Sequence, residues 1–202
     1  MKVGGVDVSR ETMDRLKIYE ALLKKWNPAI NLVAKSTLQQ AWTRHIEDSA
    51  QIYQLAPNGV GHWADLGSGG GFPGMVIAIL AMETDNPVQT TLIESDTRKC
   101  TFLRTVARET GAQVTVLSER IEDVSPLGAN ILSARALSDL STLLSFADRH
   151  MAPDGQGLFM KGATWQKEVE EAQSAWRFDH QVVKSKTENG PAILRISGVS
   201  RV

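Results

Sequence analysis

A glycine-rich segment follows a short apolar run near the end of the first third of the chain. Residues 65–74 read DLGSGGGFPG, and so many glycines allow a ligand to approach the backbone closely. Two registers fit this segment. Read from Gly69 it matches G-x-G-x-x-G, which is typical of NAD or FAD binding; read from Gly67 it matches D-x-G-x-G-x-G, with Asp65 two residues before the first glycine.

We favour the second register. A dinucleotide fingerprint begins at the strand end, where Gly67 stands. A buried carboxylate at Asp65 suits a cofactor with an ammonium group and hydroxyls better than one with a pyrophosphate. S-adenosylmethionine (SAM) carries a sulfonium, an α-amino group and a ribose, and no phosphate. Asp65 can also tie down the backbone amides of the loop, and the two roles can coexist.

A second acidic residue stands where a ribose would be bound. Glu94 ends the next predicted strand, at about the spacing from Gly67 at which a carboxylate accepts both ribose hydroxyls. The same carboxylate serves NAD enzymes, so it does not separate the two cofactors. The alternative interpretation is a solvated acidic residue before the next helix.

The elements around these residues alternate between strand and helix patterns. Short apolar runs predict strands at 62–66, 88–94, 113–117, 129–134 and 157–161, and helical patterns predict helices from 73, over 96–110, and around 138–150 and 164–175. The tail reads as a hairpin with its turn at Asn189-Gly190. We therefore expect an α/β fold, with a mostly parallel sheet covered on both faces and a C-terminal antiparallel hairpin.

The N-terminal part lacks strand patterns. An amphipathic helix is expected from Ser9 to about Trp26, interrupted at Pro28, and a second helix from about Leu38 to Leu55. We expect residues 1–58 to form a helical cap, packed on a domain over residues 59–202.

Composition excludes several classes. Of the 202 residues 42% are hydrophobic and 22% charged, and the net charge of −1 provides no global attraction for nucleic acid, so a polyanion would need a local cluster of cations. The chain shows no apolar stretch of membrane-spanning length, no signal-peptide pattern and no Cys/His cluster with metal spacing. A single cysteine suits a reducing compartment. We expect a cytoplasmic protein without a metal, monomeric by default.

Several motifs occur together in one order. They are KWNPAINLV, RHIEDS, DLGSGGGFPG, TLIESDTRKCTFLR, ILSARALSDL and LFMKG. In this combination the sequence resembles the RsmG (GidB) family of bacterial 16S ribosomal RNA methyltransferases, over roughly residues 24–162. The resemblance implies a Rossmann-like class I SAM-dependent methyltransferase fold. It also implies methyl transfer from SAM to N7 of one guanine in the decoding-region loop of 16S rRNA, with the small ribosomal subunit as partner.

The resemblance also implies which residues contact the cofactor. Carried over position by position, the family's contacts fall on Gly67, Phe72, Ile121, Glu122 and Arg135. Two positions depart from the family's pattern. Many relatives have an aspartate where this chain has Glu94, a longer acid that should still reach the ribose, and the adenine pair varies, so Ile121 is expected to contribute through its backbone.

The residue chemistry agrees with an N7 target. Cys100 lies on the apolar side of a predicted helix, as a core residue rather than a nucleophile. The segment NPAI at 27–30 lacks the second proline and the aromatic ring of amine methyltransferases. Guanine N7 already has an exposed lone pair, so no general base and no catalytic residue is expected. Arg135 and Lys161, at predicted strand ends facing the crevice, are expected to hold phosphate or the guanine edge; ordinary surface ion pairing is the alternative.

RNA binding requires a wider surface. Candidate cations are Lys24, Lys25, Lys35, Arg44, Arg98, Lys99, Arg104 and Arg108. His45 is expected to anchor the N-terminal helices on the sheet. Three rival functions remain open: a SAM enzyme acting on a small molecule, an NAD-dependent reductase, and a non-catalytic ribosome- or assembly-binding module that retains the SAM site.

Overall fold

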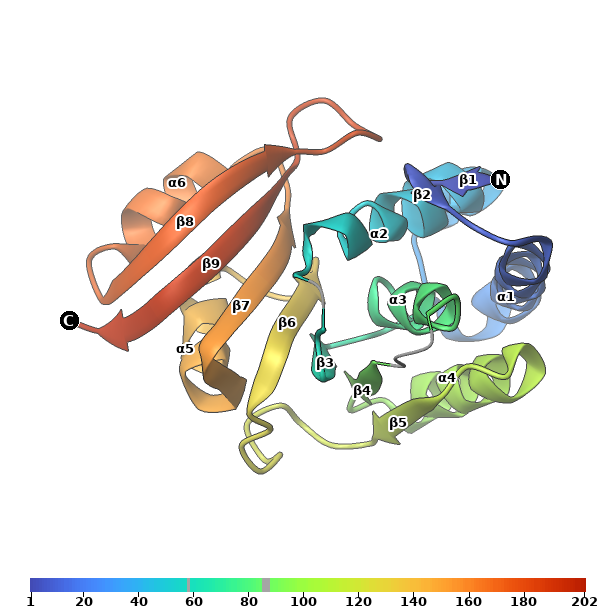
Figure 1. Cartoon of the computed structure of the whole chain (residues 1–202), viewed down its shortest axis with the longest axis horizontal. Helices are drawn as coiled ribbons and strands as arrows, with labels where there is room; N and C mark the ends of the chain where they lie inside the picture. The colour runs from blue at the N-terminus through green and yellow to red at the C-terminus, as the bar shows by residue number, and fades with distance from the viewer. Residues whose placement is uncertain (58, 85–87) are drawn as a thin grey trace.

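The computed structural model describes residues 1–57, 59–84 and 88–202. Within these residues a seven-stranded sheet forms the centre of the molecule (Figure 1). Its strands are β3 (His62–Leu66), β4 (Gln89–Ile93), β5 (Val114–Leu117), β6 (Ala129–Arg135), β7 (Met151–Lys161), β8 (Trp176–Lys184) and β9 (Ala192–Arg201). The order is β5-β4-β3-β6-β7-β9-β8. β3 to β7 are parallel, and β9 pairs antiparallel with β7 and β8, which confirms the predicted sheet and hairpin.

Helices cover both faces of the sheet. α1 (Arg10–Ile30), α3 (Gly74–Ala81) and α4 (Thr97–Thr110) share one core, and α5 (Leu140–His150) and α6 (Trp165–Ala172) pack in another. All residues of α3 are buried, because this helix is apolar on every side. α4 begins and ends as its sequence predicts: the Asp96 side chain accepts from the Arg98 and Lys99 amides, and Gly111 ends the helix at φ 74°.

The first helix is longer than the sequence predicts. α1 continues through Pro28 to Ile30 and ends at Asn31, which has φ 47°. The prediction of an interruption at Pro28 was wrong because tertiary contacts hold the last turn. Asn27 is buried on the packed face, and its Oδ1 accepts a hydrogen bond from the Val33 amide at 2.8 Å.

The second predicted helix is instead a series of short pieces. These are the 3₁₀ turn η1 (Lys35–Gln40), the π-helix η2 (Trp42–Glu47), the short α2 (Asp48–Ala50) and the 3₁₀ turn η3 (Tyr53–Leu55). A π-helical turn is a rare conformation that often marks a functional site. In η2 the Arg44 carbonyl accepts a hydrogen bond from Arg135 on β6, so a tertiary contact shapes this turn.

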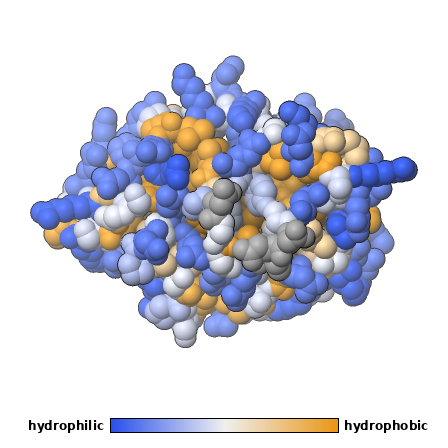
Figure 2. Space-filling view, viewed as in Figure 1, coloured by the Kyte–Doolittle hydropathy of each residue, from blue (hydrophilic) through white to orange (hydrophobic). Residues whose placement is uncertain are grey.

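The N-terminus forms a small hairpin that the sequence analysis missed. β1 (Lys2–Val3) and β2 (Val6–Asp7) pair around Gly4 and Gly5, both at positive φ. The division into a cap over 1–58 and a domain over 59–202 stays a prediction, and its boundary falls beside Asn58, outside the described residues. On the face drawn in Figure 2, hydrophilic side chains break the hydrophobic areas into separate patches.

Candidate functional site

A cavity of about 840 Å³ lies at the carboxyl ends of the parallel strands. Much of its lining comes from the last residues of β4 and β6 and from the loops after β3, β4, β5 and β6. These lining residues are 67–70, 93–95, 119–122 and 135–138. The chain passes from β3 to β4 on one side and returns to β6 on the other. The cavity therefore lies where the strand order reverses, which is where open α/β sheets bind ligands.

The glycine loop has the backbone geometry of the D-x-G-x-G-x-G register. Gly67, Gly69 and Gly71 have φ angles of 62°, 55° and 94°, a region that L side chains rarely adopt. Gly74, the last glycine of the dinucleotide register, begins α3. A Cβ at Gly67 would also collide with the Leu137 side chain across the cavity wall. Because Gly69 and Gly71 belong to both registers, only the angle at Gly67 separates them, and it favours the register that begins there.

Asp65 lies beneath the loop rather than in the cavity. Its side chain is fully buried, and Oδ1 accepts a hydrogen bond from the Ser133 hydroxyl at 2.6 Å. Burial raises the pKa of Asp65 to about 6, although hydrogen bonding with Ser133, Ser68 and the Gly74 amide opposes the rise. Its Oδ2 has no hydrogen bond of good geometry among the described residues. The structure does not place Asp65 where the prediction of direct cofactor contact requires it, because the loop covers the carboxylate; the position favours the loop-holding role.

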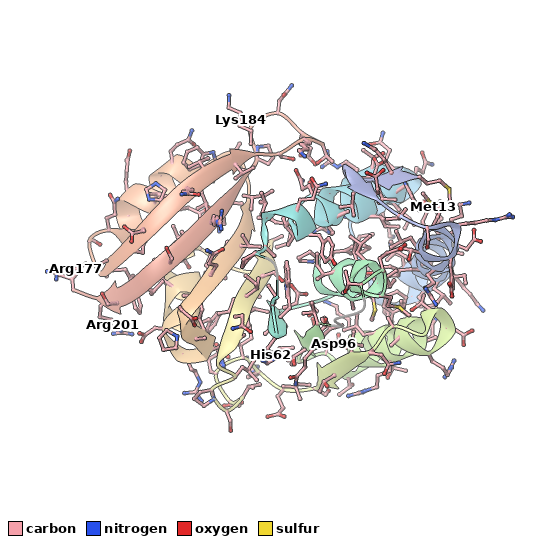
Figure 3. All side chains as sticks on the ribbon, in the orientation of Figure 1. Met13, His62, Asp96, Arg177, Lys184 and Arg201 are labelled. Atoms are coloured by element: carbon pink, nitrogen blue, oxygen red, sulfur yellow. The ribbon has the colours of Figure 1, made fainter. Side chains whose placement is uncertain are left out.

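Glu94 joins the glycine loop to the start of α4. Its Oε2 accepts from the Gly69 amide at 2.9 Å and its Oε1 from the Asp96 amide at 2.7 Å. Asp96 is labelled in Figure 3, at the start of α4. Glu94 lines the cavity, and each carboxylate oxygen keeps a second lone pair that a ligand hydroxyl can use. Glu94 therefore links the glycine loop to the start of α4, and it lies where it could also bind a ribose.

The loop after β5 forms the opposite wall. Ile121 and Glu122 both line the cavity, as expected for the adenine end. The buried His150 of α5 bonds the Ile121 carbonyl through Nε2 at 3.0 Å, and Arg149 donates to the Val124 carbonyl at 2.9 Å. Helix α5 thus fixes the backbone of this wall.

Arg135 lines the cavity and joins β6 to the N-terminal segment and to the glycine loop. Its Nη1 donates to the Arg44 carbonyl at 3.1 Å and to Asp48 Oδ2 at 3.4 Å. Its Nη2 lies 2.8 Å from His45 Nδ1, and its guanidinium lies over the Phe72 ring, 5.1 Å from the centroid. The contact with His45 places that histidine between the N-terminal segment and the sheet, as the sequence analysis expected.

Lys161 does not line this cavity, contrary to the sequence prediction. Its Nζ donates to the Ser138 carbonyl at 2.6 Å and forms an ion pair with Glu168 Oε2 at 2.6 Å. The same Glu168 oxygen accepts from the Leu140 amide. The amine is therefore held toward α5 and α6, beside a smaller cavity of about 160 Å³ that it shares with Arg135.

Tyr19 is a site residue that the sequence analysis did not identify. It is fully buried, its hydroxyl donates to the Gly70 carbonyl, and its ring stacks on Phe72 with centroids 5.1 Å apart. Burial raises the pKa of this phenol. Its hydroxyl within an otherwise apolar helix stripe was the available signal, since a buried Tyr hydroxyl usually has a partner.

The predicted RNA-binding cations divide into paired and unpaired groups. Ion pairs or carbonyl contacts engage Lys24, Arg44, Arg98, Arg104 and Arg108. Lys99 and Arg120 both line the cavity, and neither forms an ion pair with any residue that the structure describes. Lys99 belongs to the predicted set and Arg120 does not; both are available to an anionic ligand in the cavity. The predicted Lys25 and Lys35 also form no ion pair among the described residues, but they do not line the cavity.

The remaining features raised by the sequence are Cys100, metal binding and membrane-spanning helices. Cys100 is buried, and its Sγ lies 3.1 Å from the Glu94 carbonyl, as a core residue should. Over residues 1–57, 59–84 and 88–202, no group of three or more His, Cys, Asp or Glu side chains is placed to hold a metal ion. In the same ranges no helix has the length and apolar character needed to cross a membrane.

Solved structures with this sheet define the class of protein. A ribosomal protein L11 methylase from Lactobacillus delbrueckii subsp. bulgaricus superposes with a TM-score of 0.62 and 18% identity, covering 76% of this chain and 78% of that one. A TehB-like SAM-dependent methyltransferase from Corynebacterium glutamicum superposes with a TM-score of 0.59 and 11% identity, covering 90% and 98%. The fold is that of the class I SAM-dependent methyltransferases.

Sequence comparison narrows the class to one family. The family model described as GidB, rRNA small subunit methyltransferase G, matches residues 12–193. The "Ribosomal RNA small subunit methyltransferase G" of Ruegeria sp. (strain TM1040) is 53% identical over 98% of this chain and 96% of its own length. The chain belongs to the GidB, or rRNA small subunit methyltransferase G, family.

Proposed function

We propose that this chain transfers the methyl group of SAM to N7 of a guanine in 16S rRNA. The family match over residues 12–193 carries the proposal, because it spans every element that lines the cavity. The retained glycine loop, Glu94 and Arg135 support an enzyme over the alternative of a non-catalytic ribosome-binding module.

The cavity residues fit SAM. Gly69 has no neighbour closer than 3.8 Å to where a Cβ would stand, so the loop offers open backbone at this point. We assign Glu94 to the ribose hydroxyls, Ile121 and Glu122 to the adenine, and Gly67 with Phe72 to the wall beside the methionine part. Asp65 supports the loop from below and keeps a buried oxygen without a good hydrogen bond.

The chemistry asks little of this chain beyond alignment. Bound SAM supplies a methyl group made electrophilic by its sulfonium. Guanine N7 has a free lone pair and no proton to lose, so the residues need to orient the base and exclude water. We assign Arg135 to a phosphate or to the guanine edge, and Lys161 to holding the backbone at Ser138 beside it.

The partner and setting follow from the proposed reaction. The substrate is an exposed nucleotide in a loop of 16S rRNA, because side chains do not enter the deep major groove of duplex RNA. Lys99 and Arg120, which line the cavity, would contact its phosphates. We propose that the chain acts as a monomer in the cytoplasm, where small subunits are made.

A transfer assay tests the proposal. The purified chain is incubated with methyl-labelled SAM and small subunits that lack the modification, and in parallel with naked 16S rRNA; the RNA is then digested to nucleosides. We expect label in 7-methylguanosine in at least one arm. Label in another nucleoside, or none in either arm, would contradict the proposed function.

A further inference from the structure

His45 is a buried histidine on the cavity wall, in the middle of the π-helix η2. Both ring nitrogens have partners. Nδ1 lies 2.8 Å from Arg135 Nη2, and Nε2 lies 2.8 Å from Thr37 Oγ1. Thr37 Oγ1 in turn donates to the Ala34 carbonyl at 2.9 Å.

The partners determine where the imidazole proton lies. A guanidinium has only N–H donors, so Nδ1 must be the acceptor from Arg135. The remaining proton is then on Nε2, which donates to Thr37, whose own proton goes to Ala34. In this series of hydrogen bonds, every donor has an acceptor only when His45 is neutral.

The same contacts account for most of the Arg135 donors. Two N–H groups on Nη1 serve the Arg44 carbonyl and Asp48, and one on Nη2 serves His45. Since a guanidinium has five N–H groups, the second proton of Nη2 and the Nε proton remain without a hydrogen-bond partner among the described residues. They belong to a side chain that lines the cavity.

We propose that His45 is a positioning residue that acts through Arg135. Its neutral imidazole accepts one guanidinium N–H and sets the plane of the fork, so that the two uncommitted N–H groups serve the cofactor or the RNA. His45 thereby acts on the site through the arginine, in addition to lining the cavity. This inference deepens the proposed function and rests on it.

The charges around His45 agree with a neutral ring. Arg135 of β6 and Arg44 of η2 act on it as positive charges. Of the carboxylates nearby, Asp48 pairs with Nη1 of Arg135 rather than with the imidazole, and Glu188 pairs with Arg44. Burial, together with the positive charges of Arg135 and Arg44, lowers the pKa of His45 to about 3. Thr37 and the Phe72 ring, 5.1 Å from the imidazole centroid, are its uncharged neighbours.

Two His45 variants separate the hydrogen-bond acceptor at this position from the volume that the side chain fills. In H45N the amide oxygen occupies nearly the place of Nδ1 and still accepts from Arg135, whereas H45L fills similar space without an acceptor. Leaving a buried donor unpaired is expected to lower kcat/KM for small subunits by roughly tenfold to a hundredfold in H45L. H45N should stay within about threefold of the wild type.

A double-mutant cycle with R135A tests whether the effect passes through the arginine. We expect H45L to cause no further loss in the R135A background, both in methylation rate and in the Kd for SAM measured by calorimetry. H45N as inactive as H45L, wild-type behaviour of H45L, or losses that multiply with those of R135A would overturn the proposal. Circular dichroism and thermal melting identify any variant that fails to fold, and H45N then supplies the comparison.

The cycle also separates this proposal from the proposed function. If the wild type methylates no guanine, the proposed function fails, while the SAM-binding cycle still reports whether His45 and Arg135 are coupled. An Nε2-protonated neutral His45 in ¹⁵N NMR between pH 5 and 8 is the expected tautomer. A protonated Nδ1 would overturn the positioning role.

Discussion

At the scale of single residues, buried ionisable groups hold the cavity walls, and their surroundings decide which of them carry charge. His45 and Asp65 both lie where the charged form is disfavoured. Arginines and burial keep the imidazole neutral, and burial makes the carboxylate of Asp65 costly to ionise. Neither group needs to change its protonation state during methyl transfer to N7.

The Asp65 carboxyl is expected to give stability a distinct pH dependence. Its folded-state pKa of about 6 lies above the ordinary value of 3.8, so the folded chain binds this proton more tightly than the unfolded chain. The free energy of unfolding should therefore fall as pH rises from about 4 to about 6, by about 2–3 kcal/mol from this group. Urea unfolding at each pH measures it.

The matched variants for that measurement are D65N and D154N. D65N removes the titrating group, so its stability profile should lack the fall, whereas D154N replaces an exposed aspartate of β7 and should retain it. Parallel profiles for the wild type and D65N would show that Asp65 titrates normally in the folded protein.

Residue types and spacing indicated the parts of the site that follow the strands. Gly67, Gly69 and Glu94 could be located because the loop pattern and the strand ends fix them. The place of Lys161 could not, because its direction depends on Glu168, seven residues later on another element. Tyr19 was missed for the same reason: only the tertiary fold brings its hydroxyl to the Gly70 carbonyl.

At the scale of elements, Gly67 is subject to two constraints, a left-handed backbone angle and a close neighbouring side chain, which substitutions can separate. Gly67 and Gly128 have similar φ angles of 62° and 59°. A Cβ at Gly67 would collide with Leu137, whereas nothing lies within 4 Å of one at Gly128. Gly128 precedes β6 outside the cavity, so it reports the cost of the backbone angle alone.

We therefore expect G67A and G128A to differ in ligand binding. Each should lose about 1–2 kcal/mol of stability from the left-handed angle. In G67A the Leu137 side chain must also turn away, and because both residues line the cavity the Kd for SAM should rise at least about tenfold. Thermal melting and calorimetry measure the two quantities. Equal SAM affinities for the two variants would show that the loop tolerates a side chain at Gly67.

Elements were predictable where local pattern and tertiary packing agree. The parallel strands, α4 with its caps and the C-terminal hairpin followed from apolar runs and turn residues. The series of short helical turns over η1, η2, α2 and η3 did not, because contacts with Arg135 and the loop after β8 determine it. The passage of α1 through Pro28 likewise depends on the buried Asn27.

At the scale of the whole molecule, the segment over η2 and α2 meets the loop between β8 and β9 beside the cavity. Asp48 accepts from the Thr187 hydroxyl, Gln51 Oε1 accepts from the Lys186 amide at 2.9 Å, and Arg44 pairs with Glu188. The loop that contains Lys186, Thr187 and Glu188 follows Lys184, which is labelled in Figure 3 at the end of β8. The N-terminal segment and the final hairpin are thus joined beside the cavity, where Arg44, Asp48 and Glu188 belong to its lining.

Lys99 and Arg120, the two cavity-lining cations without an ion pair among the described residues, should account for part of the affinity for RNA. The double variant K99A/R120A is expected to weaken binding to 16S rRNA and to reduce the slope of log K against log salt by about one to two, since each cation neutralises about one phosphate. R177A, which removes an exposed arginine of β8 that does not line the cavity, is the control and should bind like the wild type. Filter binding over a salt series measures both slopes. Equal slopes for all three proteins would place the RNA elsewhere on the surface.

The central claim concerns one methyl group on one base, and the 16S rRNA of a deletion strain tests it most directly. Nucleoside mass spectrometry would compare small subunits from the parent, from a strain lacking this chain, and from that strain complemented with wild type or R135A. We predict that one 7-methylguanosine disappears in the deletion strain and returns with the wild-type chain but not with R135A. An unchanged amount of 7-methylguanosine in the deletion strain would contradict the claim.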